Sequence, residues 1–179
     1  MEERIVAPDP VLEPDAYKQA LLDLLGSRDP LEVMALTPSI YQEKTDGLSD
    51  EMLHRRPEPN EWSVEELLGH FWHGEIVYSF RWRLILAQPE PVLVGYDQDA
   101  WTDIARPPFH DMLDAFSALR HSNLVLARDT PRDRWSRFGK HEERGEESFE
   151  LGLNLIAGHD LAHLKQLDKT LAGIGAITE

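Results

Sequence analysis

The sequence predicts an all-α protein, an up-down four-helix bundle with extra short helices near the N-terminus. Prolines and glycines divide the chain into segments of helical length, and apolar residues recur in these segments at intervals of three and four. No segment shows a convincing alternation of apolar and polar residues, the pattern of a half-buried strand. Long helices separated by loops are typical of a bundle. The alternative is an α+β protein with a small hairpin in the two long loops.

The clearest predicted helix begins after Ser63. Ser63 and Glu66 form a capping-box pattern, in which each side chain accepts a hydrogen bond from the other residue's backbone N–H. Trp62, just before the cap, can pack against Leu67 as a hydrophobic staple. We expect this helix to extend from about residue 64 to residue 87, before a segment with two prolines.

Three other helices have clear ends in the sequence. A short one over residues 14–26 stops at Gly26, and the last one, residues 149–173, stops at Gly173, because glycine adopts the left-handed conformation that ends many helices. A long helix covers residues 109–130, with apolar residues along one side.

The segment before the Ser63 helix is predicted in two pieces. Residues 31–36 give one or two turns, and Thr37 then caps a new helix in which Pro38 is the first helical residue. Residues 91–107 and 131–148 are predicted as long ordered loops.

Length and composition indicate one domain. A chain of 179 residues can bury a core, and we expect a single domain over residues 1–179, with residues 1–14 as an extended N-terminal segment. There is no cysteine, which excludes disulfides and thiolate ligands. No run approaches the ~18 apolar residues of a membrane helix, and the acidic start does not resemble a secretory signal. We therefore expect a cytoplasmic protein with no membrane partner.

The formal net charge of -15 argues against a nucleic-acid partner. Affinity for nucleic acids comes largely from Lys and Arg that neutralise phosphates, and an acidic surface repels them. We interpret the acidity as a source of solubility. An anionic substrate would then need a local basic pocket.

Two histidines lie four residues apart in the last predicted helix, in the stretch AGHDLAHLKQL. At 100° per residue, His159 and His163 share a stripe with Leu155, Ile156 and Leu167, so both imidazoles face the bundle interior. Residues i and i+4 stand roughly 6 Å apart on one face, which lets both rings bind one ion. The pair alone is a weak signal, since a single His on an apolar face is more often a core residue. A metal site needs a third ligand from a facing helix.

The helix that follows Ser63 offers His70 and His73 as that ligand. The helical wheel places His70 with Val77 and Arg81, and Gly74, one turn on, would leave free space beside the His70 ring. His73 lies nearer the aromatic side. Geometry alone favours His70 only slightly.

The chain resembles the DinB-like superfamily, the group that includes YfiT-type metal-dependent hydrolases. The likeness covers most of the sequence, and the combination EWSVEELLGH…HDLAHLKQ is far more specific than the histidine pair. In this family the histidine that closes the EWS…H segment and both histidines of the last motif bind a divalent metal in a four-helix bundle. Matched position by position, the resemblance implies His70, His159 and His163 as ligands and a DinB/YfiT-like bundle as the fold.

The implied cofactor is a divalent metal ion, with zinc or nickel the best match to neutral imidazoles. Relatives that act as thiol-dependent transferases or isomerases often carry further residues or domains for a thiol cofactor. This chain shows no second domain, and Leu164 and Lys165 stand where many relatives have an Arg-Gly pair. A thiol cofactor is therefore unsupported.

Several residues are candidates for positions around the metal or its pocket. Glu75 could accept a hydrogen bond from a ligand imidazole, or pair with Arg81 or with a neighbouring helix. Gln166 could bond a ligand or a metal-bound water, and His141 either lines the site mouth or is solvated. Asp160 points about 100° away from the histidine stripe and is interpreted as a surface residue. The full set of pocket candidates is Glu75, Gln166, His73, His141 and Arg81.

The leading hypothesis is a metal-dependent hydrolase or thiol-dependent transferase that acts on a small molecule as a homodimer. The metal would generate a nucleophile or polarise a carbonyl. The substrate, the general base and other catalytic residues are not identified by the sequence. The alternative is a non-catalytic bundle that binds a small ligand or dimerises, with a structural metal or none. An open coordination position would indicate chemistry, and a fourth protein ligand would indicate structure.

Overall fold

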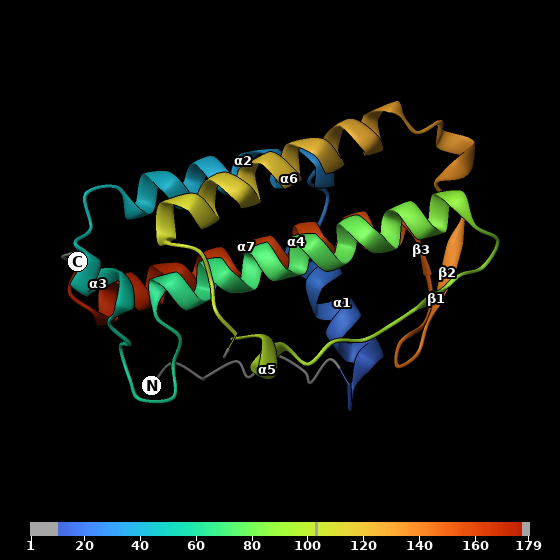
Figure 1. Ribbon diagram of the computed structural model, residues 1–179. Coiled ribbons are helices and arrows are strands. Elements are labelled where there is room, and N and C mark those ends of the chain that lie inside the picture. The colour runs from blue at the N-terminus through green and yellow to red at the C-terminus, as the bar shows by residue number, and fades with distance from the viewer. Residues whose placement is uncertain (1–10, 103, 177–179) are drawn as a thin grey trace.

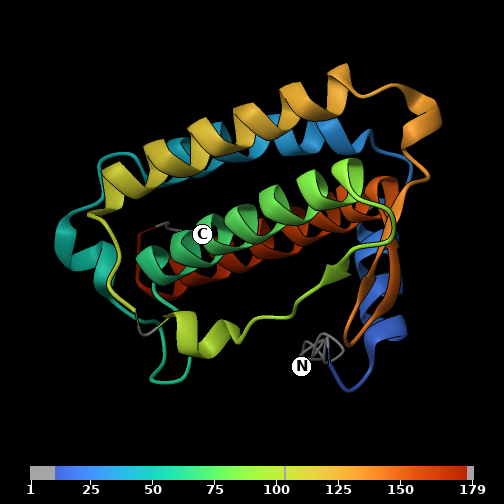
Figure 2. The same ribbon diagram turned by 45° about the vertical axis from the view of Figure 1, so that its right-hand side comes forward.

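Four long helices form the body of the protein within residues 11–102 and 104–176, which the computed structural model describes. Figures 1 and 2 show them side by side. The long helices are α2 (Pro30–Thr45), α4 (Val64–Ala87), α6 (Phe109–Asp129) and α7 (Phe149–Gly173). Shorter ones are α1 (Pro14–Leu25), α3 (Asp50–His54), α5 (Gln98–Thr102) and a 3-10 turn, Arg132–Arg134. The predicted all-α bundle is confirmed. Residues 1–10 of the predicted extended segment lie outside the described residues.

Each long helix packs against two others, in the cyclic order α2, α6, α4, α7. Chain direction reverses from α2 to α4 and again from α6 to α7 (Figure 1). Between α4 and α6, residues 88–108 return along the bundle, so these two helices run parallel (Figure 1). The up-down order thus holds at two connections, and a long crossover takes its place at the third.

A small sheet lies at one end of the bundle (Figure 1). It is formed by β1 (Val92–Leu93), β2 (Phe138–His141) and β3 (Gly145–Ser148). β1 pairs with β2 in parallel, and β2 and β3 form an antiparallel hairpin in the register Phe138–Ser148 to His141–Gly145. The two predicted loops therefore meet in a sheet, and the hairpin of the alternative interpretation is present on a helical fold. Strands of two to four residues are too short to show an alternating pattern.

Helix α4 has the predicted bounds and the predicted cap. The Ser63 Oγ accepts from the Glu66 N–H at 3.2 Å, and a Glu66 carboxylate oxygen accepts from the Ser63 N–H at 2.8 Å. Trp62 packs against the core cluster that contains Leu67. The local sequence therefore sets where this helix begins.

Helix α2 is continuous, so the predicted break at Thr37 and Pro38 is wrong. Its cap is Asp29, whose carboxylate accepts from the Leu31 N–H at 2.7 Å, and Pro30 occupies the first turn. Asp is favoured as a helix cap and Pro in the first turn, and Thr37 and Pro38 would suit the same two positions equally well. Local preference alone does not choose between the two starts.

Pro38 is tolerated inside α2 because another residue replaces its missing N–H. A helical N–H at position 38 would donate to the carbonyl of Met34, four residues before. Arg120 on α6 donates to that carbonyl instead, over 3.0 Å. Tertiary contact thus compensates for the local defect.

Arg120 also lies at the centre of a buried polar network that joins the four long helices. Its guanidinium donates through Nε to Glu75 on α4 at 2.7 Å, and through both Nη atoms to Asp160 on α7. Asn123 donates to the other Glu75 oxygen at 2.7 Å, and Thr37 donates to Asp160 at 2.9 Å. Asp160 is 1 % exposed, so its interpretation as a surface residue is wrong. α7 packs against α1, α2 and α4, which leaves little of its circumference in solvent.

Apolar clusters on both sides of this network complete the core. One is centred on Tyr41, Phe71 and Phe116, and the other on Trp82, Phe149 and Met34. In the described part of the chain, no helix has the length and apolar content needed to span a bilayer.

Replacing Arg120 by Met should lower the free energy of unfolding by about 3–5 kcal/mol, because it leaves two carboxylates buried without their partner. Urea denaturation at pH 7 measures the loss. The matched control is Lys44→Met, which breaks the exposed Lys44–Asp168 pair and should cost less than about 1 kcal/mol. Equal losses in the two variants would contradict a structural role for the network.

Candidate metal centre

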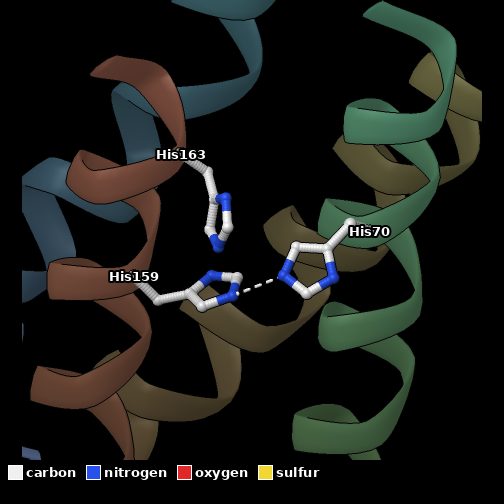
Figure 3. A group of neighbouring side chains, drawn as sticks. All are labelled: His70, His159 and His163. Carbon is white, nitrogen blue, oxygen red and sulfur yellow. Dashed lines mark hydrogen bonds between the residues drawn. The ribbon is translucent and has the colours of Figure 1, made fainter. Parts of the chain in front are cut away.

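Helices α4 and α7 run antiparallel and bring three histidines together in the bundle. His70 lies on α4, and His159 and His163 lie one turn apart on α7. Figure 3 shows the three rings pointing toward one another across the space between the two helices. The sequence predicted this convergence from the shared stripe of the two α7 histidines and from the α4 motif.

The three imidazoles are close enough to share one ion. The Nε2 atoms of His70 and His159 are 2.8 Å apart, and one ligand nitrogen from each residue lies within 4.8 Å of the others. The ring centroids are separated by 4.3 to 4.8 Å. Among the described residues, these three form the group of His, Cys, Asp or Glu side chains that could hold a metal ion. Three nitrogen donors fit Zn²⁺ or Ni²⁺.

All three rings are held in their neutral, metal-binding form. Burial lowers the pKa of His70 and of His159 well below the ordinary value, and neighbouring histidines lower both further. Burial also lowers the pKa of His163, although its bond to Gln166 opposes the shift. A neutral ring keeps a nitrogen lone pair free for a metal.

Gln166 fixes the orientation of one ring. The His163 Nδ1 donates to the Gln166 Oε1 at 2.8 Å, which leaves the Nε2 lone pair for an ion. Gln166 follows His163 by three residues on the same helix, a spacing that brings two side chains together.

Trp62 covers the histidines on one side. Its ring lies 5.0 Å from the His70 ring and 6.4 Å from that of His163, measured between centroids. A surface hollow of about 410 Å³ adjoins His163 at this point. It is lined by Asn60, Glu61, Trp62, His163, Gln166, Lys169 and Thr170. From the sequence, Trp62 is expected only to pack as a hydrophobic staple. It precedes the helix, so the helical wheel does not place it relative to the histidines.

Two candidates lie outside the histidine group. His73 stands beside Trp101, with 5.2 Å between ring centroids, and burial and Arg106 lower its pKa. Glu75 bonds Arg120 and Asn123, so of its predicted partners the neighbouring helix is the one observed.

Arg81 and His141 lie close to each other, in a different cluster near the hairpin. Burial lowers the pKa of His141 to about 3, and the charges of Arg144 and Arg81 contribute to this shift. His141 is 3 % exposed, so it is not a solvated loop residue.

Gly74, one turn beyond His70, leaves the free space that the helical wheel predicted. It is buried, yet a Cβ built there has no neighbouring atom within 4 Å. Glycine in a helix interior is less stable than alanine, so the empty volume here has no local structural benefit.

Gly74→Ala should therefore raise the free energy of unfolding by about 0.5–1 kcal/mol. Gly158→Ala is the control, since its Cβ would lie 2.2 Å from the Leu21 carbonyl oxygen of α1 and the variant should be destabilised. Urea melts of both variants measure the difference. A loss of stability in Gly74→Ala would show that the space is filled.

Comparison with known proteins agrees with this fold. The sequence model of the DinB superfamily matches residues 35–167. The chain therefore belongs to the DinB superfamily.

Among solved structures, the fold is similar to that of YfiT from Bacillus subtilis, described as a probable metal-dependent hydrolase with an unusual four-helix bundle topology. The TM-score is 0.72 at 19% identity, over 80% of this chain and 86% of YfiT. No curated protein sequence matches the chain.

Proposed function

We propose that the protein is a metal-dependent hydrolase or thiol-dependent transferase that acts on a small molecule, with His70, His159 and His163 as metal ligands. The observation that carries this proposal is the convergence of three neutral imidazoles from two helices. Membership of the DinB superfamily and the description of YfiT support the metal and the hydrolytic chemistry.

Zinc or nickel suits the site because neutral imidazole is a preferred ligand of both. A divalent metal held by three protein ligands keeps a position open, where it lowers the pKa of a water or thiol or polarises a substrate carbonyl. The chain's own residues prepare that position. Gln166 holds the His163 ring in one tautomer, and Trp62 shields the nitrogens on one side from bulk water.

The hollow beside His163 gives a small molecule a way to approach. Its volume of about 410 Å³ is in the range of small-ligand pockets. Trp62 and Gln166 form part of its wall, so a ligand there would lie next to the histidine group.

We also expect a cytoplasmic homodimer. Phe80, Val92 and Val94 are each more than half exposed and give apolar surface that a second copy could cover.

The untagged protein should contain about one zinc or nickel ion per chain, and His159→Ala should contain none, because two imidazoles hold such an ion far less tightly than three. Elemental analysis of the purified proteins measures this. His121→Ala is the control, since His121 is exposed and outside the group, and it should keep the metal. Unchanged metal in His159→Ala would refute the site.

Binding of cobalt(II) should quench tryptophan fluorescence, since Trp62 lies 5.0 Å from the His70 ring. Trp62→Phe should lose the larger part of the quenching and keep the metal. Trp135→Phe serves as the control, because Trp135 packs against Phe149 in the other apolar cluster and its loss should leave the quenching in place. Full quenching in Trp62→Phe would place the ion elsewhere.

A further inference from the structure

A second group of polar side chains lies between the hairpin and the C-terminal half of α4. We call Arg81, His141 and Arg144 the basic cluster; Arg81 is on α4, His141 ends β2, and Arg144 follows it in the hairpin turn. Arg81 and His141 are each 3 % exposed. His141 pairs with Gly145 across the hairpin, next to Arg144, and the charges of Arg144 and Arg81 lower the pKa of His141.

Each member of the basic cluster has a buried nitrogen without a hydrogen-bond partner among the described residues. These atoms are the Arg81 Nε, the Arg144 Nε and the His141 Nε2. An unpaired buried donor costs free energy, so most such groups in native proteins are satisfied. Three of them near one another indicate that the partner is a molecule the chain itself does not supply.

All three nitrogens are donors. The two Nε atoms belong to guanidinium groups, which have no acceptor. The His141 Nδ1 accepts from the Glu143 N–H at 3.2 Å, so in the neutral ring the proton is on Nε2. Their common partner must therefore be an acceptor, and two positive charges favour an anion.

Other nitrogens of the two arginines hold them in place. Arg81 donates through Nη2 to the Val94 carbonyl at 2.6 Å, and Arg144 donates through Nη2 to Glu147 at 3.1 Å. Glu147 compensates one of the two charges. Two arginines and one carboxylate give the cluster a net positive charge, whereas the whole chain has a net charge of -15.

Residues around the basic cluster contact α7, the helix that carries two of the three histidines. The Glu147 Oε1 and the Trp82 Nε1, which also lack partners, lie 3.6 and 2.7 Å from where a Cβ of Gly152 would be. Gly152 precedes His159 by seven residues on α7, about 10 Å along a helix. On α4, Gly74 lies between His70 and Arg81 in sequence, and a Cβ there would have open space around it.

We propose that Arg81, His141 and Arg144 form a subsite for a carboxylate group of the substrate. A planar carboxylate accepts from guanidinium N–H groups in pairs. Glu147 selects against a group that carries up to two negative charges, such as phosphate, whereas each carboxylate of a small acid carries one. The link to the metal rests on the proposed function, whereas the binding of a carboxylate does not.

Three tyrosines lie near the basic cluster. Tyr17 on α1, Tyr78 on α4 and Tyr96 after β1 are partly exposed. The pKa values of Tyr17 and Tyr78 are raised by burial and respond to Arg144 and Glu147, which places the rings near the cluster. Neutral phenols beside the cluster do not repel an anion.

Titration of the full-length protein with succinate, followed by backbone amide NMR shifts, tests the subsite. Saturable shifts should appear at residues 139–147. Arg144→Met should weaken succinate binding about tenfold or more, because a charged hydrogen bond is lost. Arg128→Met removes an exposed charge from α6 and should bind as the wild type does. Neutral succinamide should give no shifts, and phosphate should bind more weakly than succinate.

The proposal is overturned if residues 139–147 do not shift saturably, if succinamide shifts them equally, if phosphate binds as tightly as succinate, or if Arg144→Met binds succinate as the wild type does. Arg81→Met should lose as much succinate binding as Arg144→Met. If Arg81→Met does not fold, the proposal is still tested by Arg144→Met, because Arg144 is partly exposed, and by the shifts of the wild type. His159→Ala separates the two proposals, since it should lose metal and keep succinate binding. If His159→Ala keeps its metal while Arg144→Met loses succinate binding, the metal site alone is contradicted.

Discussion

The buried guanidinium of Arg120 is the interaction on which the rest of the structure depends. It bonds α4 through Glu75, α7 through Asp160 and α2 through the Met34 carbonyl, while its own helix is α6. Burying three charges is costly, and such networks contribute more to the choice of one arrangement than to net stability. Here the arrangement matters for the site. Glu75 follows His70 by five residues and Asp160 adjoins His159, so one side chain sets the register of both histidine-bearing helices.

Helix α4 combines three roles along its length. His70 faces the other histidines, Glu75 faces the polar network, and Arg81 faces the hairpin cluster. Apolar residues between them, such as Phe71 and Trp82, belong to the core clusters. The same helix thus contributes to the histidine group, to the polar network and to the hairpin cluster, and Gly74 leaves open space one turn after His70.

The features that could be predicted from the sequence are those that depend on residues close together in the chain. The start of α4 depends on Ser63 and Glu66, three residues apart, and was predicted with its bounds. His159 and His163 share a helix face by spacing alone, whereas the choice of His70 over His73 needed the family resemblance. Pro38 resembles a helix start in the sequence, because the donor that replaces its missing N–H is Arg120, eighty-two residues away. The hairpin was only the alternative interpretation, because strands of four residues are too short to show an alternating pattern. The burial of Asp160 was not predicted, because its partners Thr37 and Arg120 come from distant segments of the chain.

The place of α7 in the chain has a consequence for synthesis. Because α7 follows α2, α4 and α6 in sequence, those three helices are made before it. Until then Arg120 lacks Asp160, and the groove that α7 will fill exposes apolar residues of the other helices. The core of the nascent chain therefore cannot be completed until α7 has emerged from the ribosome. That helix brings two of the three histidines, so closure of the core and assembly of the histidine cluster are one event in time.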